Sequence, residues 1–203
     1  MYKNFFKDLF DFYLAVILFI FFSPLMLLVY VILYLLIGSP IYVQKRPGYM
    51  NKPFIIYKFK TLIDQKRKNK KPHKTNFKFG NFLRKTGIDE MPQLINILRG
   101  EMSFIGPRPL LMQYLKYEKF INHPRSKCVP GITGLAQIQQ NNRKIKNINN
   151  KWKLQLDKDK YYYKNLSLFL DVKIFLITFI KIFLMNKKED YLVEEPLDKK
   201  YFN

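Results

Sequence analysis

A long apolar segment lies close to the N-terminus of the chain. The 26 residues from Phe12 to Ile37 include no charged side chain, enough for a membrane-inserted helix and too many for the apolar part of a signal peptide. Pro24, near the middle, lacks the amide hydrogen that the carbonyl of Ile20 would otherwise accept, so we expect a bend there. The Ser23 hydroxyl can satisfy a backbone group that the proline frees.

Two membrane arrangements fit this segment. One is a kinked helix that crosses the bilayer once, and the other is a re-entrant helix-break-helix that enters and leaves by the same leaflet. From Lys45 to Lys85 the chain has 14 Lys or Arg residues and one acidic residue, which favours the cytoplasmic side for the part that follows. Lys3 and Lys7, at the other end, favour the same side and hence the hairpin.

The remaining pattern predicts a compact α+β, mainly helical body. Its first element is a small β-hairpin, because Ile41–Gln44 and Phe54–Lys60 are rich in β-branched and aromatic residues and a turn at Arg46-Pro47-Gly48 separates them. Apolar residues at helical spacing indicate helices at Asn81–Leu83 and Asp89–Leu98. We therefore expect two parts, a membrane-inserted segment at residues 1–40 and a body at residues 41–203.

Polar and glycine-proline-rich stretches are expected to be loops. Lys66–Lys78 is strongly basic and is typical of a solvated loop, with a dedicated anion-binding segment as the alternative. Gly106–Pro109 and Pro130–Gly134 contain residues that cannot continue a helix, and Asn141–Asn150 is polar and basic.

The apolar stretch Leu166–Met185 is interrupted by charges. Asp171, Lys173 and Lys181 argue against a second buried membrane span. An amphipathic helix at the membrane interface and a helix packed on the core both remain consistent with this pattern.

Charge and cysteine content narrow the classes of function. Lys and Arg number 36 against 15 Asp and Glu, a formal net charge of +21, so the surface should attract phosphates. Phosphates occur in nucleic acid, in anionic lipid and in nucleotide diphosphates, so all three classes of partner remain open. Cys128 is the only cysteine, which excludes an intrachain disulfide, and with two histidines no structural zinc site is expected.

Asp89 and Glu90 are adjacent carboxylates in a basic part of the chain. A carboxylate nucleophile that attacks a diphosphate needs cations or Mg²⁺ to offset charge repulsion. Arg108, in a proline-fixed loop, suits a phosphate because its guanidinium is planar and always charged. Without further information, a carboxylate that stabilises a helix start is the more common explanation for Asp89.

Four stretches of sequence carry a resemblance to a known family. They are RKTGIDEMPQLINILRGEMSFIGPRPLL at residues 84–111, QKRPG at 44–48, YKFKT at 57–61 and PGITGLAQ at 130–137. Together with the spacing of Trp152, Asp159, Tyr162, Ser167 and Asp171, they resemble the bacterial sugar transferases of the monotopic phosphoglycosyl transferase superfamily.

The resemblance implies a function and a site. Asp89 would be the nucleophile that takes a sugar phosphate from a UDP-sugar, expels UMP and passes the group to polyprenol phosphate, and Glu90 would deprotonate the acceptor or support the metal. Mg²⁺ is expected on Asp89, no nucleic-acid partner is expected, and Ser23-Pro24 would be the break of a re-entrant membrane helix. The catalytic domain would then lie on the cytoplasmic face of a bacterial inner membrane. The expected substrate-binding residues are Lys58, Lys60, Arg84, Pro107, Arg108 and Arg143.

Three departures from the family pattern bear on these expectations. Gly87-Ile88 replaces the usual serine-leucine before the carboxylates, Lys60-Thr61 replaces arginine-serine, and extra residues separate Gln137 from Arg143. Two rival interpretations therefore stay open, a membrane-tethered basic binding protein and a family member without activity.

Overall fold

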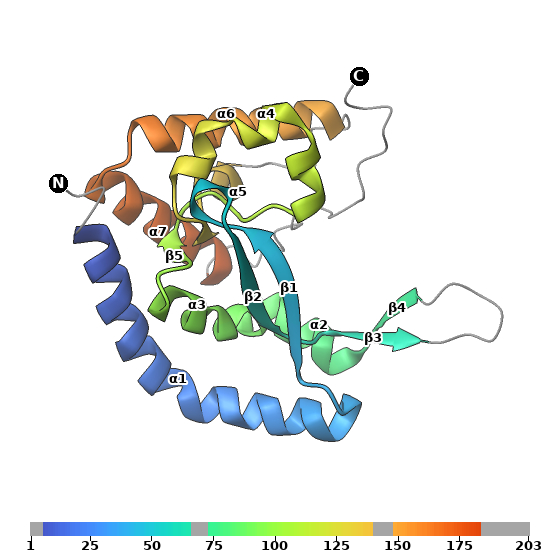
Figure 1. Cartoon of the computed structure of the whole chain (residues 1–203). Coiled ribbons are helices and arrows are strands. Elements are labelled where there is room, and N and C mark those ends of the chain that lie inside the picture. Colours follow the sequence, from blue (N-terminus) through green and yellow to red (C-terminus); the bar gives the residue numbers. More distant parts are fainter. Residues whose placement is uncertain (1–5, 66–72, 140–147, 184–203) are drawn as a thin grey trace.

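The computed structural model describes residues 6–65, 73–139 and 148–183. Helices predominate in this part of the chain, and the strands form three two-stranded sheets, so the α+β, mainly helical prediction is confirmed (Figure 1). The α-helices are α1 (Lys7–Ile37), α2 (Lys78–Thr86), α3 (Leu94–Leu98), α4 (Glu118–Ile121), α5 (Leu135–Gln139), α6 (Ile148–Lys164) and α7 (Leu168–Phe183). The 3₁₀ helices are η2 (Tyr49–Asn51), η3 (Ile88–Gln93), η4 (Met112–Lys116) and η5 (Pro124–Lys127). The strands are β1 (Ile41–Pro47), β2 (Pro53–Phe59), β3 (Leu62–Gln65), β4 (His73–Asn76), β5 (Ser103–Ile105) and β6 (Gly131–Thr133).

Helix α1 is long, apolar and bent. It contains Pro24, and Figure 1 shows the helix turning near its middle, as the sequence predicts. Ser23 Oγ donates a hydrogen bond to the carbonyl of Ile20 at 2.9 Å, which satisfies the acceptor that Pro24 leaves without an amide partner. The backbone stays helical through the bend, so α1 is one curved helix and the expected break in the helix is not seen.

The two halves of α1 pack on different parts of the body. Ala15, in the first half, joins an apolar cluster with residues of β2 and α3. Val29 and Leu33, in the second half, pack against Phe59 and Leu83. The outer face of α1 is exposed and apolar, and by length and composition the helix could cross a membrane.

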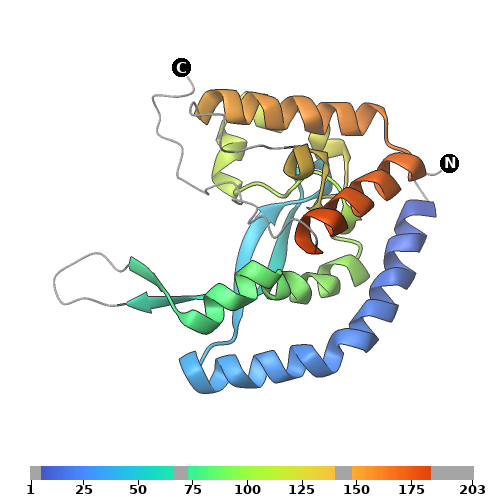
Figure 2. The ribbon, with the colours of Figure 1, turned by 180° about the vertical axis from the view of Figure 1, so that it is seen from behind.

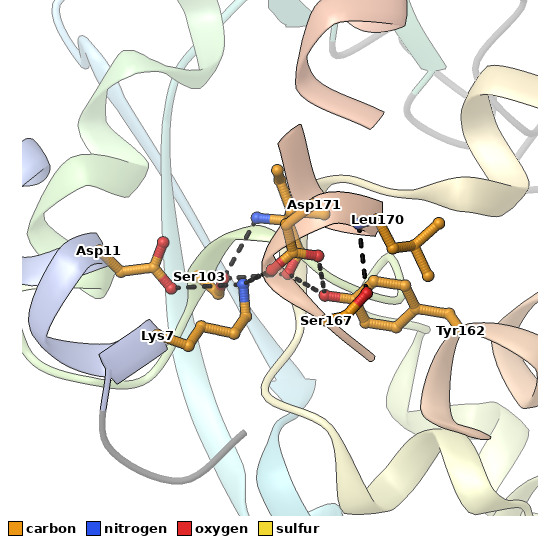
Figure 3. Close-up of polar contacts among 8 residues, drawn as sticks. Lys7, Asp11, Ser103, Tyr162, Ser167, Leu170 and Asp171 are labelled. Atoms are coloured by element: carbon orange, nitrogen blue, oxygen red, sulfur yellow. Dashed lines mark hydrogen bonds and ion pairs between the residues drawn. The ribbon is translucent and has the colours of Figure 1, made fainter. Parts of the chain in front are cut away.

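Buried charges join the start of α1 to α7 (Figure 3). Lys7 Nζ lies 2.8 Å from Asp171 Oδ2 and 3.6 Å from Asp11 Oδ2. Tyr162 from α6 contacts the other oxygen of Asp171 through its hydroxyl, at 2.7 Å. Because all four side chains are buried, this cluster fixes the first turn of α1 against the body.

The β1–β2 hairpin connects the end of α1 to the rest of the body. Its antiparallel register runs from the Ile41–Phe59 pair to the Pro47–Pro53 pair, which confirms the two predicted strands. The predicted turn is partly wrong, because Arg46 and Pro47 belong to β1 and the chain reverses at residues 48–52. Glycine 38 ends α1 in the left-handed conformation, with a φ of 70°. The hairpin therefore begins directly beside the C-terminal end of the apolar helix.

Two of the loop predictions are partly wrong. His73–Asn76, expected in a solvated loop, forms β4 and pairs antiparallel with β3; residues 66–72 lie outside the described residues. Gly131–Thr133, expected in a rigid loop, forms β6 and pairs in parallel with β5. This pairing needs glycine at 131, because a Cβ there would lie 2.1 Å from the backbone nitrogen of Gly106.

The expectation of a loop at Asn141–Asn150 is also wrong at its end. Ile148–Asn150 forms the first turn of α6, and residues 140–147 lie outside the described residues.

Helix α7 packs on the core, as one of the two alternatives predicted, while its place at a membrane interface stays a prediction. Ile174 and Asp171 are buried against the body, beside α5 and the β5–β6 pair. Phe169, Phe175 and Leu176 are exposed on its other face. Figure 2 shows the N-terminal ends of α7 and α1 next to each other, so the two helices expose apolar side chains at the same end of the molecule.

The Lys7 contacts predict a specific loss of stability. Lys7→Ala removes the cation from two buried carboxylates, which should destabilise the fold by about 3 kcal/mol and lower Tm. Lys7→Met combined with Asp11→Leu and Asp171→Leu leaves neither buried carboxylate without its cation and should lower Tm less. Thermal unfolding in detergent micelles measures both. An unchanged Tm in Lys7→Ala would show that the cluster does not hold α1 in place.

Candidate active site

A cavity of about 490 Å³ opens between the end of α1, the β1–β2 hairpin, η3 and the loop at residues 106–109. It contains both predicted carboxylates and four of the predicted cations. The charged residues of its lining are Arg46, Lys58, Lys60, Arg84, Asp89, Glu90 and Arg108.

The two carboxylates owe their position to Gly87. Helix α2 ends at this glycine, which has a φ of 75°, a left-handed conformation that other residues rarely adopt. The chain then turns into η3, and the backbone nitrogen of Glu90 donates to the carbonyl of Gly87 at 3.1 Å. Asp89 and Glu90 thus occupy the first turn of η3. The departure from the family pattern at position 87 therefore has a structural role, as a helix C-cap.

Glu90 is held by two cations from different segments. Its Oε1 lies 2.6 Å from Lys58 Nζ, on β2, and 3.2 Å from Arg108 Nη2, on the loop. Burial by itself would raise the pKa of Glu90, but Lys58 and Arg108 together lower it to about 2. The side chain is therefore a carboxylate at neutral pH and a very weak base.

Asp89 is in the opposite electrostatic situation. Burial raises its pKa to about 7 and the neighbouring charge of Glu90 adds to the rise, while Lys58, Arg108 and Arg84 oppose it. Two adjacent carboxylates therefore differ strongly in pKa, an arrangement typical of functional sites. Asp89 is the group of the pair that changes protonation near physiological pH.

A buried asparagine that the sequence interpretation did not identify sets the spacing between β2 and the carboxylates. Asn96 is fully buried on α3; its Oδ1 accepts from the backbone nitrogen of Tyr57 at 3.2 Å, and its Nδ2 donates to the carbonyl of Ile55 at 2.6 Å. These bonds fix β2, and with it Lys58, beside the helix that follows η3. A polar residue between Ile95 and Ile97, in an otherwise apolar run, was the available signal.

The other predicted site residues divide into three groups. Lys60 and Arg84 line the cavity; Lys60 Nζ donates to Ser39 Oγ at 3.2 Å and Arg84 Nη2 to Asn81 Oδ1 at 2.7 Å. Pro107 is buried and is not among the lining residues in the described part of the chain. Arg143 lies outside the described residues.

Several lining residues come from the hairpin and were not predicted as part of the site. Tyr42, Gln44 and Arg46 lie on β1 and line the same cavity as the carboxylates, and Ser39 lies just after α1. Tyr42 is paired in register with Lys58, so the two side chains leave the same face of the hairpin. Because Ser39 and Lys60 also line this cavity, it reaches the end of the apolar helix.

A protein-only metal site is not evident in the described residues. No group of three or more His, Cys, Asp or Glu side chains that could hold a metal ion occurs among them. Mg²⁺ is commonly bound by one or two carboxylates together with substrate phosphates, and Asp89 with its neighbour fits that pattern.

Comparisons with known proteins identify the family. A sequence model of the bacterial sugar transferase family matches residues 2–185. The chain is 40% identical over 180 residues to an uncharacterized sugar transferase, EpsL, of Bacillus subtilis (strain 168), a match that covers 87% of this chain and 86% of that protein. The chain therefore belongs to the bacterial sugar transferase family.

Two longer relatives have names that state a reaction. Identity is 36% over 190 residues with the UDP-glucose:undecaprenyl-phosphate glucose-1-phosphate transferase of Xanthomonas campestris pv. campestris, covering 87% of this chain and 38% of that protein. The chain is also 34% identical over 177 residues to the UDP-N-acetylgalactosamine-undecaprenyl-phosphate N-acetylgalactosaminephosphotransferase of Aeromonas hydrophila. This match covers 81% of this chain and 40% of that protein. The chain thus spans less than half the length of these two relatives.

The opposite pKa shifts predict opposite effects of two substitutions on stability. The raised pKa of Asp89 means that its ionised form destabilises the fold as the pH rises towards 7, so Asp89→Asn should raise stability at pH 8 by roughly 2 kcal/mol and much less at pH 5. The lowered pKa of Glu90 means that its charge stabilises the fold above pH 4.5, so Glu90→Gln should lower stability at both values. Tm measured at pH 5 and pH 8 tests this. Equal shifts for Asp89→Asn at both pH values would contradict the assignment.

Proposed function

We propose that this protein transfers a sugar-1-phosphate from a UDP-sugar to a polyprenyl phosphate such as undecaprenyl phosphate, with release of UMP. The observation that carries the proposal is the cavity in which Asp89 lies among cations, beside the end of an apolar helix. The names of two relatives supply the reaction class. The reaction would be the first membrane step in the assembly of a glycan.

Asp89 is the proposed nucleophile. An ionised carboxylate oxygen of Asp89 attacks the β-phosphorus of the UDP-sugar; the new oxygen–phosphorus bond forms as the bond to the bridging oxygen breaks, and UMP leaves with that electron pair. A phosphate oxygen of the polyprenyl phosphate then attacks the same phosphorus. The bond to Asp89 breaks, which restores the carboxylate and gives a polyprenyl diphosphate sugar.

The proposed role of Glu90 is to hold cations and not to accept a proton. Its pKa of about 2 makes deprotonation of the acceptor unfavourable, because a general base works best with a pKa near the operating pH. Its contacts to Lys58 and Arg108 hold both cations in the lining of the cavity that also contains Asp89. There they can bind the diphosphate oxygens and offset the charge that opposes attack.

A bound Mg²⁺ is part of the proposal. Asp89 and Glu90 are the carboxylates of the cavity that would hold it, together with oxygens of the donor. The ion would neutralise diphosphate charge and help UMP to leave. It would also favour the ionised form of Asp89.

Membrane attachment through α1 follows from the same reaction. The acceptor is a lipid, and its phosphate must reach Asp89 from the bilayer surface. The bend at Ser23 and Pro24 supports a re-entrant α1 whose two ends return to the same face, since Lys7 and the β1–β2 hairpin both belong to the body. We place the body on the cytoplasmic side of the inner membrane of a bacterium, in agreement with its positive charge.

The transferase proposal predicts that turnover depends on one carboxylate. Wild-type protein in nanodiscs, with Mg²⁺, undecaprenyl phosphate and a panel of UDP-sugars, should release UMP with at least one donor. Asp89→Asn should lower the rate by at least 1000-fold, because an amide does not act as the nucleophile. UMP production is measured directly.

Two results would contradict the transferase proposal. Full turnover in Asp89→Asn would remove Asp89 from the reaction. A wild-type protein that releases no UMP with any donor, while binding anionic vesicles, would favour a membrane-tethered binding protein. The names of the relatives include two different sugars, so the panel contains simple hexose, N-acetylated and diacetamido donors.

The re-entrant arrangement predicts a labelling pattern. Single cysteines introduced near residue 3 and near residue 70, in a Cys128→Ser background, should react with an impermeant thiol reagent from the same side of the membrane. Right-side-out and inverted vesicles make the comparison. Reaction from opposite sides would show that α1 crosses the bilayer.

A further inference from the structure

The loop that carries Arg108 is held by groups outside the loop. Residues 106–109 have no helix or strand hydrogen bonds of their own, and two of the four residues are prolines, which have no amide hydrogen to donate. The loop is therefore held by contacts with other segments: the backbone nitrogen of Gly106 donates to the carbonyl of Thr133 at 2.9 Å, and the carbonyl groups of the other three residues accept from outside the loop.

Three consecutive carbonyls of this loop have external donors. The carbonyl of Pro107 accepts from the backbone nitrogen of Gly131 at 3.1 Å. The carbonyl of Pro109 accepts from Arg46 Nη1 at 3.3 Å. Between them, the carbonyl of Arg108 itself accepts from Arg125 Nη2. Two of the three donors are thus guanidinium groups of buried arginines.

Arg125 is in turn held by Asp159. Arg125 lies on η5 and Asp159 on α6; Nη1 of the arginine is 3.3 Å from Oδ2 of the aspartate, and the two residues are 7% and 2% exposed. Burial raises the pKa of Asp159 to about 6, and the charge of Arg125 opposes the rise. A buried ion pair is a costly way to stabilise a fold, since apolar residues of the same size often do as well.

Neither member of the pair lines the cavity among the described residues, yet the pair leads directly to it. The guanidinium of Arg125 contacts the backbone of Arg108, and the side chain of Arg108 reaches Glu90 at 3.2 Å. A shift of Arg125 would therefore move the Arg108 guanidinium relative to Asp89.

We propose that Arg125 and Asp159 are positioning residues, a buried ion pair that fixes the backbone of Arg108 so that its guanidinium stays aimed at the phosphate site. This inference rests on the proposed transferase function. The pair acts only through Arg108. It contributes to the geometry of the site more than to the stability of the fold.

An apolar replacement of the ion pair tests its effect on the geometry of the site separately from its effect on the stability of the fold. Arg125→Met combined with Asp159→Leu removes both buried charges together and leaves neither unpaired, so Tm should stay within a few degrees of wild type. The rate constant kcat/KM for UMP release should nevertheless fall at least 10-fold. The matched control is Lys127→Met with Asp157→Leu, which removes one cation and one carboxylate at exposed residues of the same two helices and should leave kcat/KM unchanged.

A second comparison tests whether the pair acts through Arg108. In an Arg108→Ala background, the apolar replacement should lower kcat/KM by less than 2-fold, because the side chain that it positions is already absent. The single variant Arg125→Lys keeps a cation beside Asp159 but loses the planar guanidinium that reaches the Arg108 carbonyl. Its kcat/KM should therefore stay below that of the wild type, as in the apolar replacement.

Several outcomes would overturn the inference. One is a wild-type kcat/KM in the apolar replacement. Another is an equal loss of kcat/KM on apolar replacement whether residue 108 is arginine or alanine. The third is full activity in Arg125→Lys, which would show that a paired charge suffices. If the apolar replacement unfolds, Arg125→Lys and its kcat/KM decide alone. A wild-type protein without UMP release would overturn the proposed function itself, whereas an active wild type with an equally active replacement would overturn only the role of the pair.

Discussion

The contact of Glu90 with Lys58 and Arg108 is the interaction on which the rest of the site depends. It joins three segments that are separate in sequence, η3, β2 and the loop at residues 106–109. The two cations oppose the charge of Glu90. Burial is the largest cause of the raised pKa of Asp89, the charge of Glu90 adds to it, and the same two cations limit it. Each surrounding feature, from the Gly87 turn to the Asn96 bonds, keeps one of these segments in register with the others.

The site also depends on where the apolar helix ends. Helix α1 follows the body along both of its halves and ends at Gly38, next to Ser39 in the lining of the cavity. The Ser23–Ile20 bond and the buried Lys7 contacts keep the helix bent and attached to the body. With α1 inserted in the bilayer as proposed, a nucleophile in this cavity would lie near the bilayer surface, within reach of a lipid phosphate.

Much of this arrangement could be predicted from local sequence signals. The bend at Pro24 and the hairpin follow from backbone chemistry and strand patterns. The extended motif around Asp89 marked both carboxylates, Arg84 and Arg108, and the stretch at residues 57–61 marked Lys58. Contacts between distant segments could not be predicted in this way. The parallel pairing of Gly131–Thr133 with Ser103–Ile105 depends on two glycines that approach closely only in the folded chain. The opposite pKa shifts of two adjacent carboxylates likewise arise from burial and from cations that tertiary structure brings together.

The most direct test of the account is capture of the sugar phosphate on the protein. Wild-type protein is incubated with Mg²⁺ and a UDP-sugar labelled with ³²P at the β-phosphorus, without any acceptor lipid, and digested with trypsin. We predict label on the peptide Thr86–Arg99, which contains Asp89, and its loss when undecaprenyl phosphate is added. An unlabelled protein that still releases UMP once the acceptor is present would contradict the account, because the phosphoryl group would then pass directly from donor to lipid.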